Sequence, residues 1–172
     1  ASGACVGFCI FPLFSVGAFW GEALSISAQG VMLATGVDGA GDLQLDYGDK
    51  VATISFSKIC NGENFVEFQG ELDRLRVEFV SLMRKVELFL NDGSYELLSS
   101  NNIKNNDHFQ PMSYEISHFI DLVQNHQKYD PSIKTVNIES LQSRVTSWQL
   151  SRKVIAIIDQ ARKQIGVIYS ND

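Results

Sequence analysis

The sequence has few of the residues that mark secreted, disulfide-rich or metal-binding proteins. Its 172 residues include three histidines and three cysteines, Cys5, Cys9 and Cys60. An odd number of cysteines without a regular framework predicts reduced thiols and a cytoplasmic location. Cys5 and Cys9 are one helical turn apart, but two cysteines without a histidine are a weak zinc signal. We therefore expect both thiols to be buried and inert.

Long apolar runs are also missing. No run reaches the roughly 20 apolar residues that span a bilayer, so we expect no contact with a membrane. The most apolar stretch, Ala4–Trp20, has no lysine or arginine before it and contains Pro12. These features favour a buried helix over a signal peptide. Because the chain starts at Ala1 without a methionine, close to this stretch, the sequence is more typical of the middle of a longer protein, with a processed terminus as the alternative.

Positive charge is scarce for a nucleic-acid-binding protein. The chain has 14 lysines and arginines against 20 aspartates and glutamates, a formal net charge of −6. Proteins that bind nucleic acid normally carry a basic stripe, so we expect no nucleic-acid partner. One group of basic residues is interpreted as the solvated face and the end of a helix: Arg152, Lys153, Arg162 and Lys163.

Sequence signals for catalysis are weak. The chain has no nucleophile elbow, no Walker loop and no G-x-G-x-x-G, so we expect no cofactor site in these residues. His118 and His126 lie two turns apart on a predicted helix, but no H-E-x-x-H occurs, and we expect no metal site. Asp38 is the best single carboxylate candidate, although an Asx turn is the favoured interpretation of its glycine-rich surroundings.

Alternation of apolar and polar residues predicts consecutive strands through the middle of the chain. It is clearest in Leu43–Tyr47, Val51–Ser57 and Phe65–Phe68. Further strands are expected at Ala23–Ala34, Leu75–Phe79, Val86–Leu90, Tyr95–Leu97 and Val167–Tyr169. Helices are predicted at about residues 4–18, 113–127 and 138–165, and Gly166 is placed to end the last of them.

This order of elements predicts an α+β fold in one domain, residues 1–172. We expect an open, mostly antiparallel sheet with helices packed on one face. The loop Thr35–Asp42 contains Gly-x-Gly, but a strand follows it instead of a helix, so we interpret it as a turn and not as a phosphate site. The uncovered sheet face is expected to be an apolar interface. Its predicted residues include Tyr47, Val51, Phe65, Val77 and Leu88.

Several segments, in order, resemble motifs of the Gfo/Idh/MocA oxidoreductases. Gly3–Leu13 (G-A-C-V-G-F-C-I-F-P-L), followed by Phe19-Trp20-Gly21-Glu22, is similar to the segment that opens their C-terminal domain. Residues 35–38 are similar to the family's T-G-V-D, and residues 47–52 to its Y-x-D/N-G-x-x-A strand pair. Residues 68–71 are similar to its I-x-G-T-x-G strand, and residues 114–119 to its E-x-x-H-F helix. The helix expected from Asn137 is similar to its last helix. The likeness covers nearly the whole chain.

The resemblance implies the α+β half of a two-domain oxidoreductase. In this family a Rossmann domain binds NAD or NADP, and the α+β domain contacts a sugar, polyol or dihydrodiol and forms a homodimer through its open sheet face. The Rossmann half is absent from this sequence, so the chain alone is expected to be inactive and to need NAD or NADP only as part of a longer protein. By resemblance, Gly7, Phe11 and Asp38 are the predicted substrate-binding residues.

The chain departs from the family at the two positions that carry its acid–base chemistry. Gly7 occupies the position of the family's aspartate, and Phe11 that of its tyrosine or histidine proton donor. Neither side chain can transfer a proton. Two functions therefore stay open: part of an NAD(P)-dependent oxidoreductase, or a non-catalytic dimeric interaction or regulatory module derived from one.

Overall fold

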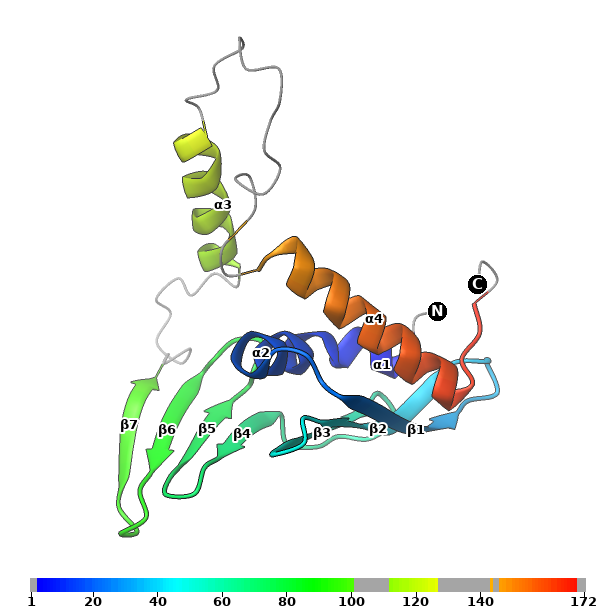
Figure 1. Cartoon of the computed structure of the whole chain (residues 1–172), viewed down its shortest axis with the longest axis horizontal. Coiled ribbons are helices and arrows are strands. Elements are labelled where there is room, and N and C mark those ends of the chain that lie inside the picture. Colours follow the sequence, from blue (N-terminus) through cyan, green and yellow to red (C-terminus); the bar gives the residue numbers. More distant parts are fainter. Residues whose placement is uncertain (1–2, 101–111, 127–142, 144–145, 170–172) are drawn as a thin grey trace. The chain divides into compact units, whose positions relative to one another are not determined.

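The computed structural model describes residues 3–100, 112–126, 143 and 146–169 (Figure 1). The predicted N-terminal helix forms as two short helices, α1 (Ala4–Phe8) and α2 (Ile10–Trp20), and within the described residues seven strands and two further helices follow. The strands are β1 (Ser25–Met32), β2 (Asp38–Asp46), β3 (Val51–Ser57), β4 (Phe65–Gln69), β5 (Arg74–Glu78), β6 (Lys85–Phe89) and β7 (Tyr95–Ser100). The later helices are α3 (Ser113–His126) and α4 (Trp148–Ile165).

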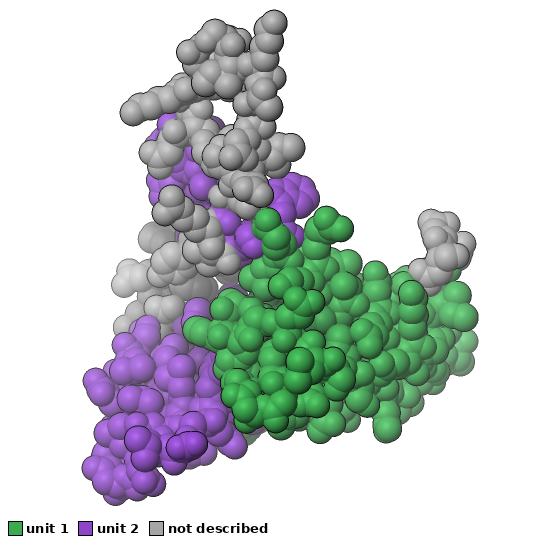
Figure 2. All heavy atoms as spheres, in the orientation of Figure 1, with its two compact units in different colours: residues 1–64, 149–172 green, residues 65–148 purple. Residues whose placement is uncertain are grey.

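The described strands form two open antiparallel sheets, which confirms the predicted α+β class. One sheet has the order β1-β2-β3 and the other β4-β5-β6-β7. They belong to two compact units, residues 1–64 with 149–172 and residues 65–148 (Figure 2). We call these unit 1 and unit 2. That residues 1–172 act as one domain stays a prediction.

In unit 1, helices α1, α2 and α4 pack on one face of the sheet β1–β3 (Figure 1). The inward residues of β2 and β3, Leu43, Leu45, Ile54 and Phe56, are all buried. They meet buried residues of the helices: Ala4, Cys5, Cys9, Leu13, Val16, Val154, Ile158 and Ala161. This alternation of buried and exposed residues is the period-two pattern that predicted the strands.

The outward face of β1–β3 is polar, unlike the apolar face that we expected. Its cross-strand rows include Ser27–Gln44–Thr53 and Gln29–Asp42–Ser55. Of the residues predicted on the uncovered face, Val51 is exposed, whereas Tyr47 packs against the core and touches Trp20 edge to face. Val77 of unit 2 is also buried. Tyr47 and Val77 therefore do not contribute to an exposed apolar face.

Helix α4 starts later than predicted and ends as predicted. It begins at Trp148, ten residues after the predicted Ile138, and Thr146 and Ser147 are not helical. The predicted stretch 138–142 lies outside the described residues. At the other end, Gly166 adopts a φ of 90°, and the N–H of Val167 donates to the carbonyl of Arg162. This bond closes the helix in the manner of a Schellman end. The strand predicted at Val167–Tyr169 does not form.

The side chain of Gln164 joins α4 to the outer edge of β1. Its Oε1 accepts the N–H of Ala28 at 2.6 Å, and its Nε2 donates to the carbonyl of Ile26 at 3.0 Å. β1 is an edge strand of the described sheet, so the backbone groups on its outer side have no strand partner there. One amide side chain thus satisfies two backbone groups that the sheet leaves unpaired.

In unit 2 the sheet β4–β7 has one apolar and one charged face. Val66, Val77 and Val86 form one cross-strand row of the apolar face, and Phe68, Leu75 and Leu88 form the next. The other face carries Arg74 and Arg76, whose guanidinium groups lie 4.3 Å and 4.2 Å from the rings of Phe89 and Phe65. Helix α3 begins at the predicted Ser113, and its apolar residues Ile116, Phe119, Ile120 and Val123 are exposed.

Candidate functional site

Helices α1 and α2 bring Gly7 and Phe11 together on one exposed face. The hydrogen bonds from Cys9 N–H to the Cys5 carbonyl and from Leu13 N–H to the Cys9 carbonyl, each 3.0 Å, continue the helical path across the junction. Cys5, Cys9 and Leu13 form the buried stripe of this path. Gly7 and Phe11 are four residues apart, so they are neighbours on the helix surface, and both are exposed.

This face, which we call the Phe8–Phe11 surface, consists of Gly7, Phe8 and Phe11. Phe8 and Phe11 are 53% and 49% exposed, and a Cβ added to Gly7 would meet no heavy atom within 4 Å. The hydroxyl of the nearby Ser15 donates to the carbonyl of Phe11 at 3.1 Å. No side chain between Ala4 and Trp20 is charged. The surface can provide apolar and aromatic contact but no proton transfer.

Asp38 lies away from this surface, beneath the start of α1. It is 1% exposed, and its Oδ2 accepts the N–H of Cys5 at 2.6 Å. The N-cap residue, Gly3, has no side chain to cap the helix, and the first turn contains no acidic residue. A carboxylate from the start of β2 therefore supplies the cap that the local sequence lacks. Its role as a substrate-binding residue stays a prediction.

Gly3 and the second carboxylate oxygen of Asp38 are close together. A Cβ on residue 3 would lie 1.8 Å from Oδ1, which is buried and has no hydrogen-bond partner among the described residues. Glycine is thus required for the carboxylate to reach the helix. Sequence reasoning missed this pairing, because 33 residues separate Cys5 from Asp38.

The thiols of Cys5 and Cys9 are free and buried, as predicted. The pKa of Cys9 is raised well above its ordinary value, first by its hydrogen bond with the Cys5 thiol and then by burial, with the charge of Asp38 adding to both. A thiol with a raised pKa stays protonated at neutral pH, so Cys9 is a poor nucleophile and a poor metal ligand. Among the described residues, no group of three or more His, Cys, Asp or Glu side chains is arranged to hold a metal ion.

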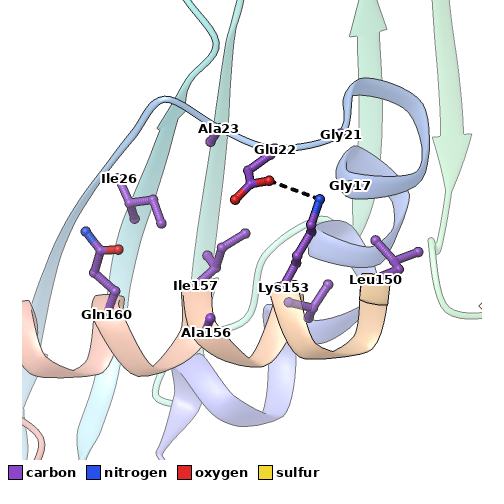
Figure 3. A pocket seen from close by; sticks show the side chains of 11 residues that line it. Gly17, Gly21, Glu22, Ala23, Ile26, Leu150, Lys153, Ala156, Ile157 and Gln160 are labelled. Atoms are coloured by element: carbon purple, nitrogen blue, oxygen red, sulfur yellow. Dashed lines mark ion pairs between the residues drawn. The ribbon is translucent and has the colours of Figure 1, made fainter. Parts of the chain in front are cut away.

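A second feature of unit 1 is a cleft of about 190 Å³ between the end of α2, β1 and α4 (Figure 3). Gly17 and Gly21 leave space on one side, and Ile157 lines the other. Lys153 reaches across to Glu22, and their charged atoms are 3.0 Å apart (Figure 3). The cleft includes none of the predicted site residues Gly7, Phe11 and Asp38, and it is smaller than the roughly 300 Å³ at which ligand pockets begin.

Of the basic residues predicted on a solvated face and at the end of a helix, Arg152, Lys153 and Lys163 are exposed on α4, whereas Arg162 is buried. Arg162 is only 6% exposed and donates to the carbonyl of Val167 at 3.2 Å. Its guanidinium also lies 4.6 Å from the ring of Tyr169. Arg162 therefore holds the end of α4, and Lys153 is paired with Glu22 across the cleft.

Neither the glycine-rich loop nor α3 provides a cofactor cradle. The loop after β1 leads directly into β2, as predicted, so its amides do not lie at a helix N-terminus and do not fit the pyrophosphate of a dinucleotide. On α3, His118 Nε2 is 2.8 Å from the Oγ of Ser143, which also accepts the N–H of Thr146. This contact was not predicted, because Ser143 was expected inside a helix.

Among the described residues, no helix is long and apolar enough to span a membrane.

Comparisons with known proteins relate the chain to oxidoreductases. No family model matches it. It is 31% identical over 167 residues to the uncharacterized oxidoreductase YgjR of Escherichia coli, and 28% identical over 165 residues to the scyllo-inositol 2-dehydrogenase (NADP(+)) IolU of Bacillus subtilis. These alignments cover 97% and 96% of this chain, but 44% of each relative. The resemblance to the Gfo/Idh/MocA oxidoreductases is confirmed.

The Gfo/Idh/MocA-like chain also shares its fold with part of a solved enzyme. The UDP-N-acetylglucosamine 3-dehydrogenase GnnA of Acidithiobacillus ferrooxidans superposes with a TM-score of 0.71 at 14% identity. The match covers 94% of this chain and 47% of GnnA. The chain is thus a partial oxidoreductase-like domain, and it spans less than half the length of the relatives that it matches.

Proposed function

We propose that this Gfo/Idh/MocA-like chain is the substrate-binding and dimerisation part of an NAD(P)-dependent oxidoreductase that acts on a sugar, polyol or dihydrodiol. The main support is the alignment of almost the whole chain with one part of a scyllo-inositol dehydrogenase. NAD or NADP would bind to residues outside this chain, because the described residues contain no dinucleotide cradle. The exposed Phe8–Phe11 surface is the proposed contact with substrate, since it holds both family acid–base positions.

The acid–base group must come from elsewhere if the protein is catalytic. Gly7 and Phe11 occupy the family's acid–base positions, and neither side chain has a titratable group. The carboxylate of Asp38 is buried and accepts the N–H of Cys5 at the N-terminus of α1. The second candidate function, a non-catalytic dimeric interaction or regulatory module, is favoured by this same observation. The two functions differ in whether nicotinamide-dependent turnover occurs.

The proposed oxidoreductase function is tested on the protein purified from its source cells. We expect reduction of NAD or NADP with scyllo-inositol or a related polyol. A Gly7→Trp variant should raise the KM by about tenfold, because its side chain would enter the open space beside Phe11. Gly62→Trp is the matched control, since a Cβ at Gly62 also meets no heavy atom within 4 Å. No turnover with any sugar, polyol or dihydrodiol would reject this function and favour the non-catalytic module.

We also propose that the chain forms a homodimer through the open sheet face. Val51 is 57% exposed on the polar face of β1–β3, and Phe65 is 42% exposed on the charged face of β4–β7. Val51→Asp would place a carboxylate opposite Asp46, its cross-strand partner, and an unpaired buried charge is costly. We expect it to weaken the dimer at least tenfold in light-scattering dilution series.

Two variants complete the dimer test. Phe65→Asp should weaken association in the same way. Leu72→Asp is the control, because Leu72 is 72% exposed in the turn between β4 and β5 and not on a strand face. A mass that stays that of two chains in both strand-face variants would contradict a dimer through this face.

A further inference from the structure

We infer that the cleft between α2, β1 and α4 binds a small zwitterion with an apolar side chain, the chemistry of an aliphatic α-amino acid. The two charged groups of the ligand separate the ion pair of Lys153 with Glu22 and each takes one partner, while its side chain enters the cleft. The residues of this site are different from those of the Phe8–Phe11 surface, and the site is independent of the proposed oxidoreductase function.

The walls of the cleft are mostly apolar. Its apolar lining residues are Ala23, Ile26, Leu150, Val154, Ala156 and Ile157. Figure 3 shows the side chains of Ile26 and Ile157 between β1 and α4. A Cβ on Gly17 would lie 2.9 Å from Cδ1 of Leu150, so α2 and α4 are in contact at one end of the cleft. The apolar part of a ligand is therefore removed from water when it lies between these elements, which is favourable.

The volume of the cleft limits the size of the ligand. At about 190 Å³ it lies below the usual range of pockets for drug-sized ligands. It is nevertheless larger than an apolar protein cavity of roughly 150 Å³ that accommodates benzene. A branched aliphatic side chain is no larger than benzene and fits this volume, whereas a nucleotide does not.

One positive and one negative side chain meet at the cleft. Nζ of Lys153 on α4 and Oε2 of Glu22, in the connection between α2 and β1, are 3.0 Å apart (Figure 3). The two side chains are 48% and 73% exposed. An ion pair this exposed contributes little to stability, so separating its two groups costs little. Both side chains can turn toward solvent by rotation about their own bonds and admit a ligand.

A zwitterion is the ligand that leaves both of these charges paired. Its carboxylate accepts hydrogen bonds from Nζ of Lys153, and its ammonium group donates to the carboxylate of Glu22, so one charge-assisted contact becomes two. The two groups of an α-amino acid are bonded to the same carbon atom, so they can reach two side chains that already touch. A ligand with only a carboxylate would take Lys153 from Glu22 and face a second negative charge. A ligand with only an ammonium group would face Lys153 in the same way.

The test uses the full chain labelled with 15N and an NMR titration that follows the amide signals of Ala23 and Ile157, two residues of the cleft. L-Leucine is the zwitterionic probe. Isocaproate lacks its ammonium group, isoamylamine lacks its carboxylate, and glycine lacks its side chain. Lys153→Gln and Glu22→Gln each remove one charge from the cleft. Lys163→Gln is the matched control, because Lys163 is exposed on α4 and does not line the cleft.

We expect leucine to shift both amide signals in the millimolar range, and each of the other three probes to bind at least threefold more weakly. Lys153→Gln and Glu22→Gln should each weaken leucine binding by at least threefold, and Lys163→Gln should not. Four results would each overturn the inference: no shift with leucine, equally strong binding of another probe, unchanged binding in either cleft variant, or an equal loss in Lys163→Gln. Failure of the oxidoreductase proposal is read separately, from the absence of NAD or NADP reduction.

Discussion

Replacing Gly41 with alanine should lower the free energy of unfolding by about 3 kcal/mol, the upper end of the usual cost of overpacking a core. A Cβ at this position would lie 2.4 Å from the carbonyl oxygen of Gln29, 2.7 Å from Cζ of Phe56 and 3.0 Å from Cα of Gly30. Two of these three atoms are backbone atoms of β1. They cannot move away without disrupting the pairing of β1 with β2. The added methyl group would therefore strain the backbone of the sheet. Urea denaturation monitored by circular dichroism measures the change.

Gly62→Ala is the control for Gly41→Ala. A Cβ at Gly62 meets no heavy atom within 4 Å, and the residue lies in the connection between β3 and β4. We expect its free energy of unfolding to stay within about 0.5 kcal/mol of the original protein, as for most surface substitutions. Equal effects of the two substitutions would show that the close contact at Gly41 relaxes without cost.

The second large effect is expected where Asp38 caps α1. Asp38→Ala removes a hydrogen bond between a charged acceptor and the N–H of Cys5 and leaves that buried donor unpaired, which typically costs about 2 kcal/mol. Gly3→Ala should cost a similar amount or more, because its Cβ would lie 1.8 Å from Oδ1 of Asp38. Both variants are measured by urea denaturation of the full chain.

The double variant Gly3→Ala/Asp38→Ala separates this contact from general damage to the fold. When Asp38 is alanine, the oxygen that clashes with the new methyl group is gone. The double variant should therefore lose clearly less than the sum of the two single losses, by about 1 kcal/mol or more. Strict additivity would mean that Gly3 and Asp38 act independently and that the cap does not require glycine.

The local elements of this fold were largely predictable, because they depend on periodicity and turn residues. The strands of Leu43–Phe68 followed from alternation, and Gly166 predicted the end of α4. The strand expected at Val167–Tyr169 failed because the N–H of Val167 closes the helix on the carbonyl of Arg162. An apolar triplet after a helix gives no sign of that bond.

Features that depend on distant residues were not predictable. The division of the strands into two sheets leaves no mark on the alternation of each strand. Arg162 was expected in solvent, yet the Val167 carbonyl and the ring of Tyr169 surround its guanidinium group. In the candidate site, the neighbouring positions of Gly7 and Phe11 followed from helical spacing. The burial of Asp38 did not, because its partner lies on another element.

The contact between Gln164 and β1 has a consequence for the behaviour of the protein at high concentration. An edge strand with free backbone groups is a template on which a strand of another molecule can add, and repeated addition leads to fibres. Here the N–H of Ala28 and the carbonyl of Ile26 are already occupied by one amide side chain. The same glutamine that anchors α4 thus blocks the addition of another strand at these two groups of the edge.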